Sequence, residues 1–256
     1  MHKMNRAKYF SESIAINERL RELVKNDENH HFLYNKAGQT AYVYLTSFVK
    51  KYCEEYFKKP FGEIKVLDWG SGKGHVTFLL KQLKANVDSC DVIDDSDDSS
   101  FGQKTPIITS QRIDVKPLEH EYILPYNDES YDVVLSFGVL EHVPNDLESL
   151  RELNRILKPR GLLFCFFLPY YMSWTQRLSH LRGNYYHDRL YRKDQTATML
   201  NDTNFSVLDM WHRQLLPKNS INYPNYKLFE KLDLFLCNHT FLKYFATNIE
   251  FVAVKK

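Results

Sequence analysis

Three glycines and a set of carboxylates are the first residues in this sequence whose types and spacing could do chemistry. Asp68 is followed by Gly70, Gly72 and Gly74, so a glycine stands at every second position after an apolar run. Glycines at this spacing let the backbone turn sharply and approach a ligand where a Cβ atom would collide with it. Residues 75 to about 84 predict a helix whose free N–H groups point toward the turn. The stretch therefore indicates a site for a nucleotide-type cofactor.

Two familiar phosphate-binding loops do not match this spacing. A Walker A loop needs a glycine five residues before its Gly-Lys pair and Ser or Thr after it. Here Gly72-Lys73 has Leu67 at the first position and Gly74 at the second. A dinucleotide-binding G-x-G-x-x-G loop needs a third glycine where this chain has His75. The acidic residue also lies before the glycines, inside the end of the predicted strand.

A second carboxylate follows at a distance that suits a ribose contact. Asp91 lies 23 residues after Asp68, at the end of a predicted strand, with Val92 next to it. An acidic residue about 20 residues beyond the first strand of such a sheet reaches the ribose hydroxyls, and a carboxylate accepts from two vicinal hydroxyls at once. Asp94 is the fallback for this role. The alternative is that Asp91 belongs to a solvated acidic loop.

Composition narrows the class of protein. The 256 residues are 43% hydrophobic and 26% charged, which is typical of a globular chain of one α/β domain with insertions. A net charge of +2 does not favour nucleic acid as a partner. No signal peptide and no bilayer-spanning apolar run is recognisable, so a cytoplasmic location is expected. Four widely spaced cysteines without a C-x-x-C pair predict neither a disulfide framework nor a metal site.

Strands and helices alternate along the chain, which predicts a sheet that is parallel at its centre. Apolar residues at helical spacing predict helices over residues 4–25, 38–59, 146–158, 193–201 and 226–236. Short apolar runs predict strands over 64–69, 86–93, 107–115, 131–137, 162–168, 205–211 and 249–254. Residues 94–106 are polar, so the crossover there is expected to be short or irregular.

Two further motifs carry a family resemblance. Residues 124–134 read L-P-Y-x-D-x-S-Y-D-V-V, and residues 139–143 read V-L-E-H-V. Together with the glycine turn and the L-x-E-L-x-R-x-L-K-P-x-G string before Leu162, they resemble the class I S-adenosylmethionine (SAM)-dependent methyltransferases. The likeness is to the type 11 branch, whose members modify small molecules and lipids.

The resemblance implies a fold and a division of the chain. The expected fold is a Rossmann-like three-layer α/β sandwich, with a mostly parallel seven-stranded sheet, helices on both faces and an antiparallel last strand. Residues 1–62 would form helices that cover the sheet and also the pocket. Residues 63–256 would form the SAM-binding core, with an acceptor lid at about 169–192 and a helical insertion at about 214–247.

The resemblance also implies contacts to SAM. Glycine backbone would pass close to the methionine part and the ribose, carboxylates would bind the ammonium and the ribose hydroxyls, and the third strand would end at the adenine. The fourth strand would end beside the methyl group. The residues assigned to these contacts are Asp68, Gly70, Ser71, Gly72, Gly74, Asp91, Val92, Asp114, Val115, Phe137 and Gly138.

His142 is the candidate general base, because an imidazole titrates near the working pH of most enzymes. The alternative is a structural histidine that bonds a backbone carbonyl beside the cofactor. His187 and Tyr191 are a second pair on the acceptor side, for which surface or lid packing is the favoured role.

The predicted function is transfer of a methyl group, with oxygen favoured, to a small-molecule, sugar or lipid-linked acceptor. The aromatic, basic segment 169–192 and the amphipathic segment 226–236 suggest cell-envelope or polysaccharide synthesis and peripheral membrane contact. A quinone or prenyl-ring methyltransferase and a catalytically silent SAM-binding partner subunit remain open. A nucleic-acid methyltransferase is disfavoured, because Ser136-Phe137-Gly138-Val139 stands where such enzymes carry an N/D-P-P-Y/F/W-type tetrapeptide.

Overall fold

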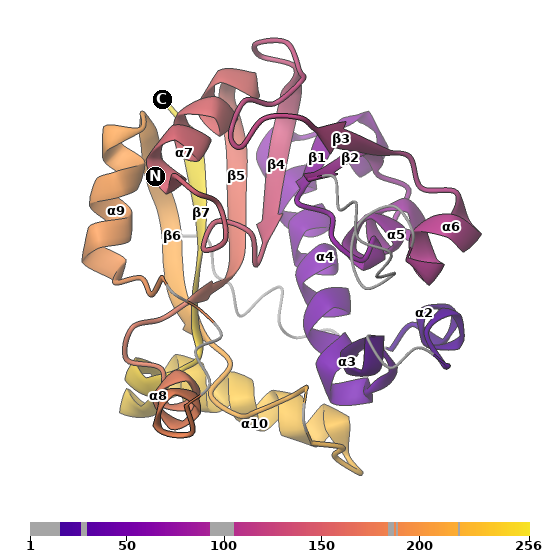
Figure 1. Cartoon of the computed structure of the whole chain (residues 1–256), viewed down its shortest axis with the longest axis vertical. Coiled ribbons are helices and arrows are strands. Elements are labelled where there is room, and N and C mark those ends of the chain that lie inside the picture. Colours follow the sequence, from indigo (N-terminus) through magenta and orange to yellow (C-terminus); the bar gives the residue numbers. More distant parts are fainter. Residues whose placement is uncertain (1–15, 27–29, 93–104, 184–186, 188, 220) are drawn as a thin grey trace. The chain divides into compact units, whose positions relative to one another are not determined.

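The computed structural model describes residues 16–26, 30–92, 105–183, 187, 189–219 and 221–256 (Figure 1). The chain divides into two compact units. The first is Met1–Glu119 with Lys218–Glu230, and the second is His120–Pro217 with Lys231–Lys256. The expected division into residues 1–62 and 63–256 stays a prediction.

Seven strands form one mixed sheet. They are β1 (Lys65–Trp69), β2 (Asn86–Val92), β3 (Val115–Leu118), β4 (Tyr131–Phe137), β5 (Leu157–Pro169), β6 (Phe205–Arg213) and β7 (Asn248–Lys255). Their order in the sheet is β3-β2-β1-β4-β5-β7-β6. The pairs β1–β2, β2–β3 and β4–β5 are parallel, whereas β7 is antiparallel to both β5 and β6. This topology confirms the Rossmann-like fold and the antiparallel last strand that the sequence predicted.

The first unit holds the helices that precede and follow β1. They are α2 (Glu18–Leu23), α3 (His31–Tyr34), α4 (Lys36–Phe57), the 3-10 turn η2 (Phe61–Glu63), α5 (His75–Gln82) and α6 (Pro106–Gln111). Asn35 caps α4, because its side chain accepts from the Ala37 N–H at 2.9 Å. Lys58 takes a left-handed conformation after the helix and Pro60 follows, so α4 ends close to the predicted position.

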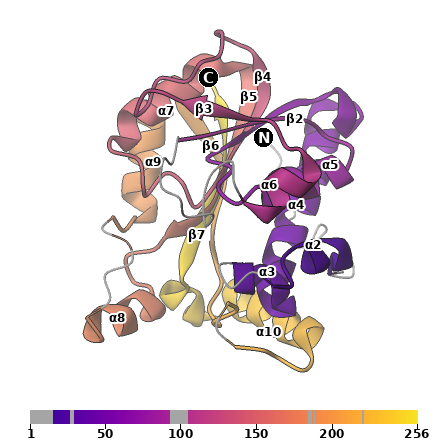
Figure 2. The same ribbon diagram turned by 45° about the vertical axis from the view of Figure 1, so that its right-hand side comes forward.

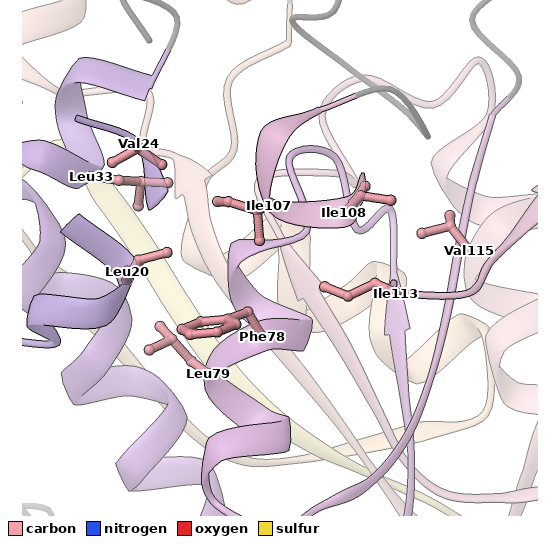
Figure 3. Close-up of a cluster of buried hydrophobic side chains, with 9 residues drawn as sticks. All are labelled: Leu20, Val24, Leu33, Phe78, Leu79, Ile107, Ile108, Ile113 and Val115. Carbon is pink, nitrogen blue, oxygen red and sulfur yellow. The ribbon is translucent and has the colours of Figure 1, made fainter. Parts of the chain in front are cut away.

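A cluster of buried apolar side chains holds these helices together (Figure 3). Leu20 of α2, Phe78 of α5 and Ile107 of α6 point into its centre. Burying each such side chain stabilises the fold by roughly 1.5–3 kcal/mol. The cluster therefore fixes α5, the helix that follows the glycine turn, against the N-terminal helices. Its members are Leu20, Val24, Leu33, Phe78, Leu79, Ile107, Ile108, Ile113 and Val115.

One predicted strand is wrong. Residues 107–115 were expected to form the third strand, but residues 106–111 form α6, and β3 only begins at Val115. The run of β-branched residues favours a strand locally. Pro106 at the first helical turn favours a helix start, and the helix buries Ile107 and Ile108 in the apolar cluster. Packing therefore outweighs the local strand propensity.

The second unit carries the remaining helices. They are α7 (Asp146–Ile156), α8 (Trp174–Leu181), α9 (Lys193–Asp202) and η4 (Phe241–Phe245), while α10 (Tyr226–His239) begins in the first unit and ends here. The predicted helices over 146–158, 193–201 and 226–236 are confirmed, as are strands β6 and β7. Within the described residues, the helices lack the combination of length and hydropathy that crossing a bilayer requires.

Candidate active site

The glycine turn after β1 has the geometry that its sequence predicted. Gly70, Gly72 and Gly74 have φ angles of +70°, +49° and +76°. Residues that carry a Cβ atom rarely adopt these backbone conformations. The N–H groups of Gly70 and Ser71 donate to the carbonyl of Cys90 at 2.9 and 3.0 Å. The end of β2 therefore holds the turn in place.

Gly74 is constrained by its neighbours as well as by its backbone. A Cβ atom added there would lie 2.5 Å from Cγ1 of Ile108. The Gly74 N–H donates to the carbonyl of Ser71 at 2.8 Å, and α5 starts at the next residue. This close approach of α5 and α6 is the packing reason for a third glycine.

Asp91 lies against the same turn. Its carboxylate accepts from the Gly72 N–H through Oδ2 and from the Val92 N–H at 2.8 Å through Oδ1. Burial raises the pKa of Asp91, and these two N–H donors lower it in part. The structure thus brings together two parts of the predicted cofactor site, while the ribose contact itself stays a prediction. Asp94, the fallback, lies outside the described residues.

Asp68 is a buried carboxylate beneath the turn. Its Oδ2 accepts from the Thr77 hydroxyl at 2.6 Å, and that hydroxyl also lies 2.8 Å from the hydroxyl of Ser89. Burial raises the pKa of Asp68 to about 7, and Asp91 adds to the rise, while the Thr77 hydrogen bond opposes it. Sequence reasoning did not single out Thr77. Its place in the first turn of the helix after the glycines was the available signal.

His75, the first residue of α5, was also missed. Burial lowers its pKa to about 3, with further lowering by His30 and Lys73, so its imidazole is neutral at physiological pH. The ring centroids of Tyr42 and His75 are 4.5 Å apart, and those of Phe32 and His75 are 5.6 Å apart, both in edge-on arrangements. Residues of α3 and α4 therefore cover the residue that follows the glycine turn.

Asp114 and Val115 lie at the start of β3, and their adenine contacts stay a prediction. Val115 pairs with Ser89, and the strand runs parallel to β2, so Asp114 precedes the amino end of β3 and is exposed. The glycine turn and Asp91 lie at the carboxyl ends of their strands. The first carboxylate beyond the carboxyl end of β3 is Glu119.

The second unit contains the other predicted residues. Phe137 ends β4, and its ring lies 4.7 Å from that of Phe166 on β5. Gly138 follows with a φ angle of +66° and donates its N–H to the carbonyl of Phe166 at 3.0 Å. The positive φ angle turns the chain sharply after β4, which sets the position of the residues that follow.

Glu141 and His142 form a buried acid beside an exposed imidazole. Burial raises the pKa of Glu141 to about 7. Its Oε1 lies 4.0 Å from Nε2 of His142, whose side chain is 57% exposed. An exposed imidazole can reach a second molecule and accept a proton from it. A carboxylate at this distance stabilises the imidazolium that then forms.

A third side chain, His187, lies next to this pair. Its ring centroid is 5.4 Å from that of His142, and one ligand-type atom from each of Glu141, His142 and His187 lies within 4.8 Å of the other two. A carboxylate and two imidazoles are a donor set that divalent transition metals accept. Sequence reasoning predicted no metal site, and it missed this group because His187 is distant along the chain.

Tyr191 packs against the residues between β4 and α7. Its hydroxyl lies 3.1 Å from the carbonyl of Leu140 and 3.2 Å from Oδ2 of Asp146. Burial raises its pKa well above the ordinary value. These partners make Tyr191 a residue that holds segment 169–192 against the start of α7, in agreement with the packing role that the sequence favoured.

Comparison with known proteins adds independent evidence. Residues 67–165 match the model of a methyltransferase domain family. The chain is 24% identical over 207 residues to a ubiquinone biosynthesis O-methyltransferase of Rickettsia bellii, an alignment that covers 74% of this chain and 82% of that protein. It is 35% identical over 109 residues to the human mitochondrial ubiquinone biosynthesis O-methyltransferase, covering 41% of this chain and 29% of that protein.

Solved structures of other proteins share this fold. A SAM-dependent methyltransferase from Thermotoga maritima superposes with a TM-score of 0.55 at 15% identity, over 94% of this chain and all of that one. The match at this level of identity concerns the fold.

Proposed function

The chain is a class I SAM-dependent methyltransferase, and we propose that it methylates a hydroxyl oxygen on a small apolar acceptor of the phenol or catechol type. The names of its curated relatives, which are O-methyltransferases of ubiquinone biosynthesis, support this choice. They favour the quinone alternative over the sugar and cell-envelope acceptors, which draw no support from these relatives.

The residues of the first unit suit SAM as the donor. SAM supplies a methyl group on a sulfonium, so the leaving group is already activated. A turn that excludes Cβ atoms can approach the donor closely, and the Asp91 carboxylate beside it suits two ribose hydroxyls. The buried Asp68 carboxylate accepts from the Thr77 hydroxyl, and an ammonium group, directly or through water, would add the positive charge that favours its ionised form.

The proposed acceptor chemistry depends on one observation, the exposed His142 imidazole beside the buried Glu141 carboxylate. A hydroxyl oxygen becomes a sufficient nucleophile when its proton is removed as the new bond forms. In this proposal His142 accepts that proton and Glu141 stabilises the resulting imidazolium. A phenol or catechol suits such a base, because its proton is far more acidic than that of a sugar hydroxyl.

Incubation with methyl-labelled SAM tests the acceptor class. A catechol, the same catechol with a prenyl chain, and a hexose would be compared as acceptors, with product identified by mass spectrometry. We expect methyl transfer to the catechols and none to the hexose. Transfer to the hexose alone would contradict the proposal. Tight SAM binding without transfer to any of these or to an extracted lipid pool would favour the silent partner subunit.

Replacing His142 tests the base. We expect His142→Gln to lower kcat by about 100-fold, within the range typical of general bases, while SAM affinity measured by calorimetry stays unchanged. The loss should shrink at high pH, where the acceptor hydroxyl ionises without help. Equal activity of the variant and the parent at pH 7 would leave His142 with a structural role.

A further inference from the structure

Two helical segments and the 3-10 turn of the second unit expose large apolar side chains. Leu181 at the end of α8 is 85% exposed, Phe241 in η4 is 71% exposed, and Phe235 in α10 is 56% exposed. Side chains of this size, exposed together, usually mark an interaction surface. We call this surface the basic-apolar face; it comprises Arg177, Leu178, Leu181, Arg182, Lys231, Leu232, Phe235, Phe241, Lys243, Tyr244 and Phe245.

These residues are held in one packed body. Leu215, Cys237 and Ala246 form a small buried cluster against which Trp174, Leu236 and Leu242 pack. The Trp174 Nε1–H donates to the carbonyl of Leu215 at 2.7 Å. The cluster joins α8, the C-terminal part of α10 and η4, which lie at the same end of the second unit (Figures 1 and 2). The exposed side chains therefore belong to a folded surface.

In this unit, α10 buries a carboxylate and exposes two large apolar side chains, while Leu236 and Cys237 pack inward. Its acidic residue, Asp233, is buried and accepts from the N–H groups of Leu215 and Leu216 at 2.9 and 2.8 Å. Leu232 and Phe235 instead face solvent. A surface helix normally buries its apolar side chains and exposes its charges. The acid is fixed inward by two backbone donors, so the outward apolar side is built into the fold.

The charges around the apolar side chains have one sign. Residues 174–183 and 231–247 are all described, and they carry Arg177, Arg182, Lys231 and Lys243, against the single buried acid Asp233. A face of this composition is repelled by an identical face on a second copy at close contact. It matches the interface of a bilayer that contains anionic lipids, where apolar and aromatic side chains enter and basic ones meet head groups.

We propose that the basic-apolar face binds the surface of an anionic lipid bilayer. The binding goes beyond methyl transfer and does not depend on it. Its consequence for the proposed function is that an acceptor with a prenyl chain, which resides in the bilayer, would be met at the membrane surface.

Flotation of the full chain with lipid vesicles tests this binding. Vesicles of phosphatidylcholine alone would be compared with vesicles containing 30% phosphatidylglycerol. We expect binding to the anionic vesicles to be at least tenfold stronger, and to fall as salt is raised. Phe235→Ser combined with Phe241→Ser, and separately Lys231→Glu combined with Lys243→Glu, should each reduce it at least tenfold.

Ile123→Ser is the matched control, because Ile123 is 51% exposed in the second unit and lies outside the basic-apolar face. This control should bind vesicles as the parent does, and circular dichroism and calorimetric SAM binding should be unchanged in all variants. Equal binding by the Phe235/Phe241 variant and the parent would overturn the proposal. So would a concentration-dependent dimer that these substitutions abolish in a chain that does not bind vesicles, since a second copy would then cover the face. These readouts are independent of acceptor identity, so they stand even if the proposed function fails.

Discussion

At the scale of single residues, two carboxylates lie near the carboxyl ends of β1 and β2, where we propose that SAM binds. Burial raises the pKa of both carboxyls, and the Asp91 charge adds to the rise at Asp68. A cationic ligand nearby would relieve both effects. The apo form therefore stores an electrostatic cost that a positively charged group at this site removes.

This cost predicts a pH-dependent stability. The pKa of Asp68 in the folded chain is about 7, above the ordinary value, so the folded chain retains a proton that the unfolded chain releases between about pH 4 and 7. Asp68 therefore makes folding less favourable as pH rises through this window. We expect Asp68→Asn, whose amide oxygen still accepts from Thr77, to raise the free energy of unfolding by on the order of 1–3 kcal/mol at pH 8.

The gain should shrink toward pH 4, because the folded carboxyl stays protonated there and the unfolded carboxyl becomes increasingly protonated as well. Denaturant unfolding of both proteins at pH 4.5 and pH 8 measures this difference. The same gain at both pH values would show that the ionisation of Asp68 does not limit stability.

Asp91 and Asp114 offer a paired test of the cofactor contacts. Asp91→Ala removes a carboxylate that accepts from the Gly72 N–H, and we expect it to weaken SAM binding at least tenfold. Asp114→Ala removes an exposed carboxylate at the other end of its strand, and we expect SAM affinity to stay within twofold of the parent. Titration calorimetry measures both. A large loss from Asp114→Ala would support the adenine contact that the resemblance implies for that residue.

At the scale of elements, the glycine turn depends on α6, a helix where the sequence predicted a strand. Gly74 lets α5 approach Ile108 of α6, and Ile108 belongs to the apolar cluster of the first unit. The packing of α6 thus supports the turn from one side, while the end of β2 supports it from the other.

Gly74→Ala should therefore be more damaging than backbone strain alone. An alanine at φ +76° costs about 1–2 kcal/mol, and the Cβ atom at 2.5 Å from Ile108 adds roughly 1–3 kcal/mol of overpacking. Gly183→Ala is the matched control, because Gly183 has φ +77° and nothing within 4 Å of the added atom. We expect thermal unfolding to show a clearly larger loss for Gly74→Ala, accompanied by weaker SAM binding. Equal losses would mean that Ile108 moves aside.

At the scale of the whole molecule, a segment from the last third of the chain belongs to the first unit. Lys218 and Glu230 form a fully buried ion pair at 2.6 Å, and Glu230 also lies 3.4 Å from the hydroxyl of Thr40 on α4. The Asn35 side-chain amide donates to the carbonyl of Ile221 at 3.0 Å. Ile221 and Glu230 are therefore tied to the start of α4 by polar contacts.

Breaking this pair should destabilise the first unit strongly. Lys218→Met leaves the Glu230 carboxylate buried without its cation, and we expect a loss of about 3–5 kcal/mol. Lys227→Met, at an exposed position in the same helical insertion, should change stability by less than about 0.5 kcal/mol. Denaturant unfolding gives both values, and adding Glu230→Leu to the first variant should recover most of the loss. A mild effect of Lys218→Met would show that water reaches Glu230.

The sequence by itself determined the parts of this protein that local patterns specify. Strand β1, the glycine turn and β4 follow from short apolar runs and glycine spacing, and the order of strands and helices was sufficient to predict a mostly parallel sheet. Asp91 was placed correctly beside the glycine turn, because strands of a parallel sheet end at the same edge. These features depend on neighbours within a few residues or on one repeated topology.

Only the tertiary structure decided the rest, because it depends on contacts between distant segments. Burial of Ile107 and Ile108 turned a run with strand propensity into α6, so Asp114 precedes β3 instead of lying near its end. The approach of His187 to Glu141 likewise joins residues 46 positions apart along the chain, which no local pattern specifies. Helical periodicity alone could not say that α10 turns Asp233 inward and Phe235 outward, since backbone donors 17 and 18 residues away along the chain hold that carboxylate.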